Sequence, residues 1–129
     1  MLTFKKNEHL CSYSKINALF NKGLQFTVFP FKVVWMISEK EQSSMAEVAI
    51  TVPKRIHKKA VTRNLIRRRS KEAYRLNKSQ LYNFLTEKNI KIEFMIIYLD
   101  SNILSFDILN NKIKLIFERF KQEYEKTNK

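Results

Sequence analysis

The sequence predicts an α+β fold class, a small mixed β-sheet with packed helices, in a single domain over residues 1–129. Two observations predict the fold. The length of 129 residues fits one domain, and 44% hydrophobic residues are enough for a buried core. Segments rich in Val, Ile and Phe also alternate with segments whose apolar residues recur at helical spacing. The predicted element order is α-β-β-α-β-α, with three or four strands.

The first part of the chain predicts one short helix. Residues 1–12 are polar and are expected to be extended. A helix is predicted over 14–22, because Ser14 can cap its start and Gly23 can end it. The apolar residues of this helix share one side: Ile16, Leu19 and Phe20.

Two strands are predicted next. The first covers 26–38 and is interrupted at Pro30, and the second covers 46–52, after a polar loop at 39–44. We expect these two strands to pair as an antiparallel hairpin. Alternation along the first strand places one set of bulky side chains on a single face: Phe31, Val33 and Trp35.

The second half predicts helices on both sides of a central strand. The central helix covers 61–77, and 79–88 either extends it with a bend or forms a separate short helix. Residues 91–99 are almost continuously apolar, as expected for a strand in the middle of a sheet. A final helix covers 106–124, and 125–129 are expected to be frayed. The predicted buried stripe of this last helix is Phe106, Leu109, Ile113, Ile116, Phe117 and Phe120.

The composition is strongly basic. The chain has 25 Lys and Arg residues against 12 Asp and Glu, a formal net charge of +13 and a pI near 10.0. This balance is typical of proteins that bind nucleic acid. No segment is apolar over a length that could span a bilayer, and the N-terminal segment lacks the apolar core of a signal peptide. The single cysteine, Cys11, excludes an intrachain disulfide and fits a reducing cytoplasm.

The basic residues concentrate between positions 54 and 78, mostly within the predicted central helix. On a helical wheel, Arg63, Arg67 and Lys71 form a row with a spacing of about 6 Å, which can follow a phosphate backbone. The wheel places the remaining residues on two sides: Asn64, Arg68, Tyr74 and Arg75 beside this row, and Val61, Leu65, Ile66, Ala73 and Leu76 opposite it.

A solvated amphipathic helix is the simpler interpretation of such a charge run. Solvated helices usually mix both signs, so that residues four apart attract each other. Here the polar face carries only positive charge, and Glu72 lies at the border of the apolar side. Because like charges at this spacing repel, an anionic partner would relieve the cost. The predicted RNA-binding residues are Lys54, Arg55, Lys58, Lys59, Arg63, Asn64, Arg67, Arg68, Arg69, Lys71 and Arg75.

We predict no catalytic residue and no metal site in this chain. The acids are scattered, and no close acidic pair ends a strand, as a two-metal nuclease would require. His9 and His57 have no partner at metal-ligand spacing. We interpret both as ordinary polar residues that are able to contact phosphate.

Several segments together resemble the protein component of bacterial ribonuclease P. That family carries an Arg-Asn-Arg signature after a Lys-Lys-Ile type of turn. This chain has KRI at 54–56, AVTRNLIRR at 60–68 and EAYR at 72–75. Upstream, INALFNKG at 16–23 is similar to the family's first helix and its terminal glycine. The order of elements agrees over nearly the whole chain.

The resemblance implies both a fold and a function. The family fold has α-β-β-α-β-α order with an unusual left-handed β-α-β crossover. The chain would be the accessory protein subunit of an endoribonuclease whose RNA subunit binds the Mg²⁺ ions and removes the 5′ leader of precursor tRNA. The implied partners are the catalytic RNA and precursor tRNA, without a membrane or an obligate protein partner. The implied location is the cytoplasm.

By position, the resemblance also implies roles for single residues. It implies a cleft for the leader between the first helix and the sheet, lined by Ile16 and Phe20. Ile16 stands where the family often has a second aromatic residue, so one stacking face is missing. Leu65 occupies the third signature position, and Arg69 stands one turn later, where the family usually has an apolar residue. We hypothesise that Arg69 restores the charge lost at Leu65. The residues implied on the RNA-facing helix and its approach are Lys54, Arg55, Arg63, Asn64, Arg67 and Arg68.

Other classes of protein remain open from the residues alone. The main alternative is a ribosomal-type or RNA-chaperone protein that binds RNA without a catalytic role. The scattered acids argue against a self-sufficient metal-dependent nuclease. A DNA-binding regulator would need a helix-turn-helix signal that this sequence does not show.

Overall fold

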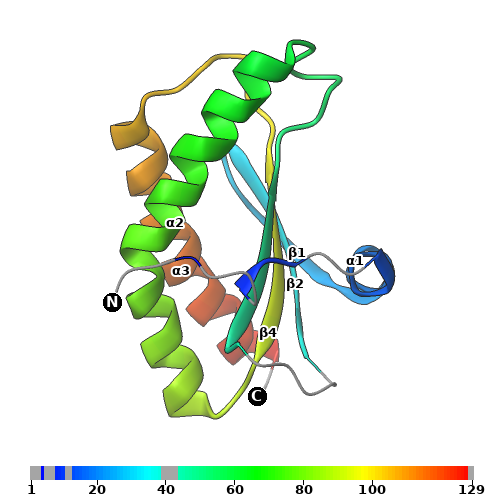
Figure 1. The fold of residues 1–129 in the computed structure, drawn as a ribbon. Coiled ribbons are helices and arrows are strands. Elements are labelled where there is room, and N and C mark those ends of the chain that lie inside the picture. The colour runs from blue at the N-terminus through cyan, green and yellow to red at the C-terminus, as the bar shows by residue number, and fades with distance from the viewer. Residues whose placement is uncertain (1–3, 5–7, 11–12, 39–43, 128–129) are drawn as a thin grey trace.

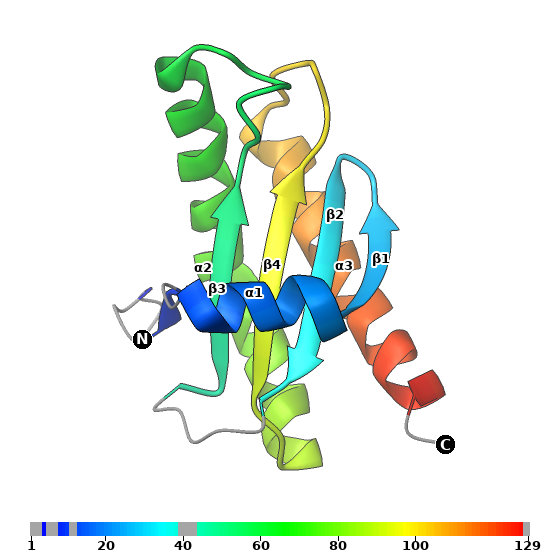
Figure 2. The same ribbon diagram turned by 90° about the vertical axis from the view of Figure 1, so that its right-hand side faces the viewer.

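Three helices and four strands make up the part of the chain that the computed structural model describes, which is residues 4, 8–10, 13–38 and 44–127. Helices α2 and α3 lie side by side on one face of a sheet, and α1 crosses the other face (Figures 1 and 2). The predicted α+β class is therefore confirmed. The elements in chain order are α1 (Tyr13–Lys22), β1 (Leu24–Val28), β2 (Phe31–Ile37), β3 (Ala46–Thr51), α2 (Ala60–Lys88), β4 (Ile92–Tyr98) and α3 (Phe106–Thr127).

The strand order in the sheet is β1-β2-β4-β3. The β1–β2 and β2–β4 pairs are antiparallel, and β3 is parallel to β4, with Val48 opposite Phe94. The predicted hairpin between 26–38 and 46–52 is therefore wrong, because β4 lies between those strands. As its continuous apolar run predicted, β4 is buried and central.

The predicted interrupted strand is in fact two strands, which form a hairpin of their own. β1 and β2 pair from Leu24 opposite Trp35 to Val28 opposite Phe31, and the chain turns at Phe29 and Pro30. Proline has no backbone N–H for the ladder, so the chain turns back at Pro30 instead of continuing as one strand. The predicted alternation along β2 is confirmed.

The crossover from β3 through α2 to β4 is left-handed. In Figure 2 both strands point upward, β4 lies to the right of β3, and α2 lies behind the sheet. Nearly all crossovers between parallel strands have the opposite hand. The unusual crossover that the resemblance implied is therefore present.

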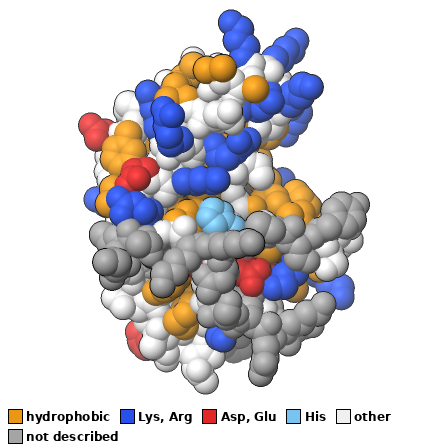
Figure 3. Space-filling view, in the orientation of Figure 1, with side chains coloured by type: hydrophobic (Ala, Val, Ile, Leu, Met, Phe, Trp, Pro, Cys, Tyr) orange, Lys and Arg blue, Asp and Glu red, His pale blue; other side chains and the backbone are white. Residues whose placement is uncertain are grey.

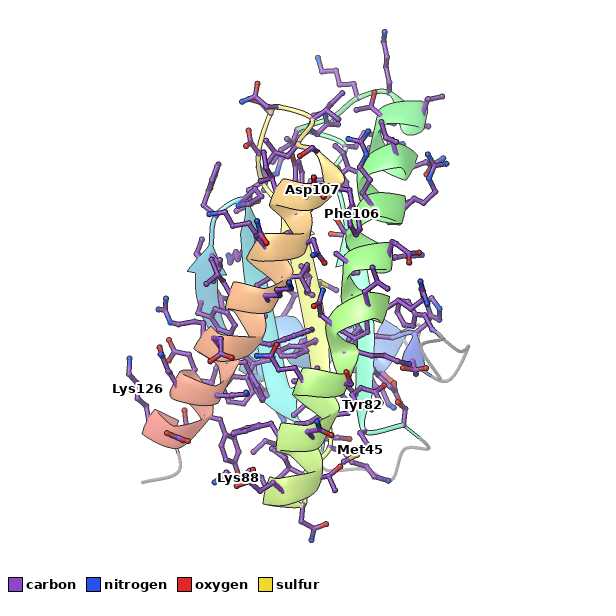
Figure 4. The ribbon with its side chains drawn as sticks, turned by 90° about the vertical axis from the view of Figure 1, so that its left-hand side faces the viewer. Met45, Tyr82, Lys88, Phe106, Asp107 and Lys126 are labelled. Atoms are coloured by element: carbon purple, nitrogen blue, oxygen red, sulfur yellow. The ribbon has the colours of Figure 1, made fainter. Side chains whose placement is uncertain are left out.

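The main core fills the space between the sheet and the two long helices, which Figure 4 shows from the helical side. Phe120 of α3 lies at its centre. Its ring meets Trp35 edge-on at 4.9 Å and Phe94 at 5.0 Å between centroids. The predicted stripe of α3 is confirmed, with Phe106 only partly buried, and α3 continues three residues beyond the predicted end.

Helix α2 is continuous over 29 residues, so the segment 79–88 extends the central helix rather than forming a second one. It ends at Asn89, whose left-handed backbone (φ 56°) lets its N–H donate to the carbonyls of Leu85 and Thr86.

The buried face of α2 differs from the predicted one. Ile66 and Ala73 are buried as predicted, but Tyr74, predicted beside the cations, is fully buried and meets Phe117 edge-on at 5.9 Å. Val61, predicted as apolar core, is 81% exposed. The reason is that α2 packs against both the sheet and α3. Its buried stripe is therefore centred closer to Tyr74 than the helical wheel predicted.

Helix α1 packs closely on the outer face of the sheet. Leu19 is buried against Val34 and Met95. Gly23 ends the helix as predicted, but by close approach and not by a left-handed backbone, since no glycine has positive φ. A Cβ at Gly23 would lie 2.3 Å from the Leu19 carbonyl oxygen and 2.8 Å from Val34 Cγ1, so a side chain would push α1 away from the sheet.

The N-terminal segment 8–10 covers the free edge of β3. The N–H of Leu10 donates to the carbonyl of Val48 at 2.9 Å, and His9 forms a parallel bridge with Val48. The carboxylate of Glu8 forms an ion pair with Lys78 of α2 at 2.6 Å. The segment is therefore attached to both β3 and α2. Cys11 lies outside the described residues.

Candidate nucleic-acid interface

Lys and Arg side chains gather over the first half of α2 and over the connector, residues 52–59, as Figure 3 shows. No acid lies in the first turn of α2, and its N-cap, Lys59, makes no side-chain hydrogen bond to the helix. The first backbone N–H groups of a helix carry partial positive charge. This end of α2 therefore attracts anions through its backbone as well as through its side chains.

Three cations form the centre of this surface, namely Arg67, Arg68 and Lys71. The ion pairs between described residues leave all three without an acidic partner. Asn64 accepts a hydrogen bond from Arg67 Nη1 at 2.9 Å through its Oδ1, which orients the guanidinium group. The structure thus brings together four of the predicted RNA-binding residues on one flank of α2.

Arg63 differs from the other members of the predicted row. Its Nη1 donates to the backbone carbonyls of His57 at 3.0 Å and Lys58 at 2.8 Å. This contact holds the connector against the first turn of α2. The other predicted residues of the approach are exposed: Lys54, Arg55, Lys58 and Lys59.

Arg75, predicted beside the row, already has an acidic partner. Its guanidinium forms a salt bridge with Glu72, including an Nε–Oε1 hydrogen bond of 2.9 Å. Glu72 was placed at the border of the apolar side, and the structure shows it half-exposed beside the cations. Part of the charge of Arg75 is therefore neutralised within the chain.

Arg69 points to the other side of the helix. It is two positions away from both Arg67 and Lys71, which places it about 200° around the helix from each. Its Nη1 donates to the backbone carbonyl of Leu104 at 2.8 Å, in the loop before α3. Leu65, on the same side of α2, is half-buried. Arg69 therefore stabilises the loop before α3 and does not extend the row of cations.

The substitution Arg69→Ala tests the hypothesis that Arg69 replaces the charge lost at Leu65. We expect it to lower the free energy of unfolding by about 1 kcal/mol, because the Leu104 carbonyl loses its donor. RNA affinity should fall no more than in Lys114→Ala, an exposed residue of α3. Denaturant unfolding and filter binding measure the two effects. A clearly larger loss of affinity than in the control would show that Arg69 contributes to RNA binding.

His57 is buried, so its interpretation as a residue able to contact phosphate is corrected. Its Nε2 lies 2.8 Å from the backbone carbonyl oxygen of Asp100, and its ring lies 5.9 Å from that of Tyr98. A carbonyl oxygen only accepts, so Nε2 carries the hydrogen. His57 therefore joins the connector to the loop after β4. Nothing in its local sequence indicates this partner, which lies 43 residues away.

A second candidate surface lies where α1 crosses the sheet. Phe20 is 52% exposed and Ile16 is half-buried, and their spacing of four residues places them on one side of α1. Partly buried apolar side chains of the outer sheet face lie near this helix, among them Met36 and Ile97. Sequence reasoning did not select these two, although strand alternation places them on the same face as Val34 and Met95.

A groove of about 470 Å³ beside the cations contains Phe4, which sequence reasoning did not assign to the interface, and His9, which it interpreted only as a polar residue able to contact phosphate. Their rings are stacked, with centroids 4.0 Å apart and planes inclined by 7°. No local signal could have placed them there, because both come from the N-terminal segment. The complete lining is Phe4, His9, Asn64, Arg67, Arg68, Lys71, Glu72 and Arg75.

Two tyrosines behind this groove stay neutral. Burial, followed by the nearness of Tyr82 and Glu8, raises the pKa of Tyr74 well above its ordinary value. Burial also raises the pKa of Tyr82, and its hydrogen bond to Glu8 adds to the effect. Neither hydroxyl group therefore adds negative charge near the cations at neutral pH.

The described part of the chain holds neither a cluster of metal-binding side chains nor a helix that could span a membrane. Within residues 4, 8–10, 13–38 and 44–127, no three His, Cys, Asp or Glu side chains are grouped so that they could hold a metal ion. In these residues, too, no helix has the length and apolar character needed to cross a bilayer.

The fold and the basic flank of α2 together define a nucleic-acid-binding α+β protein. The family model described as "Ribonuclease P" matches residues 4–121. The ribonuclease P protein component of Porphyromonas gingivalis is 35% identical over 94 residues, which are 71% of this chain and 69% of that protein. The chain therefore belongs to the ribonuclease P protein family and is the protein subunit of ribonuclease P.

Solved structures confirm the fold independently. The RNase P protein of Staphylococcus aureus matches with a TM-score of 0.71 at 16% identity, over 88% of this chain and 95% of that one. The RNase P protein of Thermotoga maritima matches with a TM-score of 0.68 at 18% identity, over 87% and 96%. The family assignment also favours the ribonuclease P interpretation over the alternative of a ribosomal-type or RNA-chaperone protein.

Proposed function

We propose that this chain, as a single RNA-binding domain, binds the RNA subunit of ribonuclease P through the exposed flank of α2 and the connector. The observation that carries the proposal is a set of three cations that have no acidic partner among the described residues, Arg67, Arg68 and Lys71. Like charges at this spacing destabilise a helix, and a phosphate backbone relieves that repulsion. Arg63 and Asn64 support the surface by holding the connector and orienting Arg67.

The second part of the proposal concerns precursor tRNA. We propose that the single-stranded 5′ leader lies along the outer sheet face beside α1, where Phe20 offers an exposed ring. Aromatic side chains stack on unpaired bases without strong sequence preference. The close packing of α1 at Gly23 fixes the distance between Phe20 and the sheet, which supports a preformed cleft.

We also propose that cleavage of the leader requires Mg²⁺ ions and that the RNA subunit binds most of these ions. The described residues of this chain do not fit such an ion, because they form no cluster of three or more carboxylate, imidazole or thiol groups. We therefore assign no catalytic residue to this chain. Its contribution is to bind and align the two RNA molecules, and we place it in the cytoplasm.

Cleavage of a leadered precursor tRNA tests the proposal directly. The protein alone, the RNA subunit alone and their mixture are compared at low and high Mg²⁺. We expect efficient cleavage at low Mg²⁺ only in the mixture, because added cations of the protein replace part of the charge screening that Mg²⁺ supplies. An RNA subunit that works equally well without the protein would contradict the proposal, and cleavage by the protein alone would require an active site in this chain.

A further inference from the structure

The groove beside α2 joins an aromatic wall to a positively charged wall. Phe4 and His9 of the N-terminal segment supply the aromatic wall, and Arg67, Arg68 and Lys71 of α2 supply the charged wall. Its volume of about 470 Å³ is within the range of sites that hold one small ligand. The combination matches the two parts of a nucleotide, a flat base and a phosphate.

The aromatic wall is supported from behind by the protein core. The ring of Phe4 stacks on His9 on one side and leans on Tyr74 on the other, at 5.2 Å between centroids. Tyr74 is fully buried in the core. His9 is only half-buried, so part of its ring is open to the groove. A ring held in this way offers a face on which a further ring can stack.

The backbone that carries His9 is also fixed. His9 bridges to Val48, and the adjacent Leu10 N–H donates to the same residue at 2.9 Å. On the other side, Glu8 is held by Lys78 at 2.6 Å. Because the wall is held in place before RNA binds, less conformational entropy is lost on binding.

The side chains of the charged wall carry a net positive charge. Glu72 is the acid among the lining residues, and it is engaged by Arg75. Asn64 turns the guanidinium of Arg67, and Arg68 is exposed. Arginine and lysine side chains in this arrangement can donate several charge-assisted hydrogen bonds to one phosphate.

We propose that this groove holds one unpaired nucleotide of the RNA subunit, with its base stacked on His9 and its phosphate between Arg67, Arg68 and Lys71. The inference rests on the proposed binding of that RNA by α2. A paired nucleotide does not fit the chemistry, because both faces of its base are covered by neighbours in the helix. The groove would therefore distinguish a bulge, loop or end from a duplex.

Filter binding of the RNA subunit to His9→Ala, His9→Phe and the unchanged protein provides the first test. Loss of one stacked base is worth about 1–3 kcal/mol, so the Kd of His9→Ala should rise about 5- to 160-fold. The salt dependence should keep its slope, since no phosphate contact is removed. His9→Phe keeps a ring and should keep the affinity. Phe29→Ala is the matched control, because Phe29 is 58% exposed at the turn between β1 and β2, on the opposite edge of the sheet.

Photocrosslinking provides a second test that does not depend on affinity. A His9→benzoylphenylalanine variant is irradiated with the RNA subunit, and the crosslinked position is found by primer extension. We expect one main stop, at a nucleotide that is unpaired in the RNA, and no such stop from the same change at Phe29.

The outcomes separate the two proposals. If the unchanged protein does not bind the RNA subunit, the proposed function fails. If it binds while His9→Ala binds equally well, or if position 9 crosslinks only to paired nucleotides, the groove proposal alone is overturned.

Discussion

Replacing Lys78 by Met should lower the free energy of unfolding by about 3–5 kcal/mol, because the change removes a cation in direct contact with the buried Glu8 carboxylate. The side chains of Lys78 and Glu8 are 9% and 6% exposed, and their charged atoms lie 2.6 Å apart. The hydroxyl of Tyr82 also donates to Glu8, but a neutral donor cannot replace the lost charge. Denaturant unfolding followed by circular dichroism measures the loss.

Two further variants show whether the ion pair itself causes the effect. Lys114→Met removes an exposed cation of α3 and should change stability little. The double variant Glu8→Gln, Lys78→Met removes both charges and should recover a large part of the loss. If Lys78→Met were as stable as Lys114→Met, the pair would not hold the N-terminal segment to α2.

The combined change of Arg67, Arg68 and Lys71 to Ala should produce the largest loss of RNA binding. Each phosphate contact contributes about 0.7–0.9 to the slope of log affinity against log salt concentration, so the slope should become shallower by about 2–3. Charge-assisted hydrogen bonds contribute about 1.5–3 kcal/mol each, so the affinity should fall at least about a thousandfold. Filter binding to the RNA subunit over a range of salt concentrations measures both quantities.

A control with the same change of net charge is available on α3. Lys112, Lys114 and Lys126 are also three cations, and replacing them by Ala removes the same charge from another surface. We expect this variant to keep most of the affinity and the slope. Equal losses in the two triple variants would mean that net charge, rather than the flank of α2, determines binding.

Local patterns in the sequence predicted the elements well. The apolar stripe of α3 was predicted because its apolar residues recur with the helical period of 3.6 residues. The buried strand β4 was predicted because its residues are almost continuously apolar. Both patterns lie within one segment of the sequence. The one strand pairing that was predicted, between 26–38 and 46–52, was wrong. Whether β3 pairs with β2 or with β4 depends on which helices pack on the two faces of β4. These contacts join residues from all parts of the chain, so no local pattern predicts the pairing.

The candidate site was predicted only in part, for a similar reason. The wheel assumed that α2 buries one half of its surface, but α2 contacts two neighbours and buries Tyr74 as well. Arg63 was assigned to RNA by its place in the row and by the resemblance, and Arg69 as a replacement for the charge lost at Leu65. Both guanidinium groups donate to backbone carbonyls, which depend on the fold of the connector and of the loop before α3. The aromatic wall at His9 depends on contacts with β3 and α2 that no spacing along the sequence reports.

The hand of the crossover decides whether the two proposed RNA surfaces lie on the same side of the sheet or on opposite sides. Because the connection is left-handed, α2 lies on the side of the sheet that α3 occupies, and α1 is alone on the other side (Figure 1). A right-handed connection between the same strands would bring α2 over the outer face, beside Phe20. The two proposed RNA surfaces would then compete for one side. Placed back to back, they allow the domain to act as an adaptor, with one RNA on each side and four strands between them.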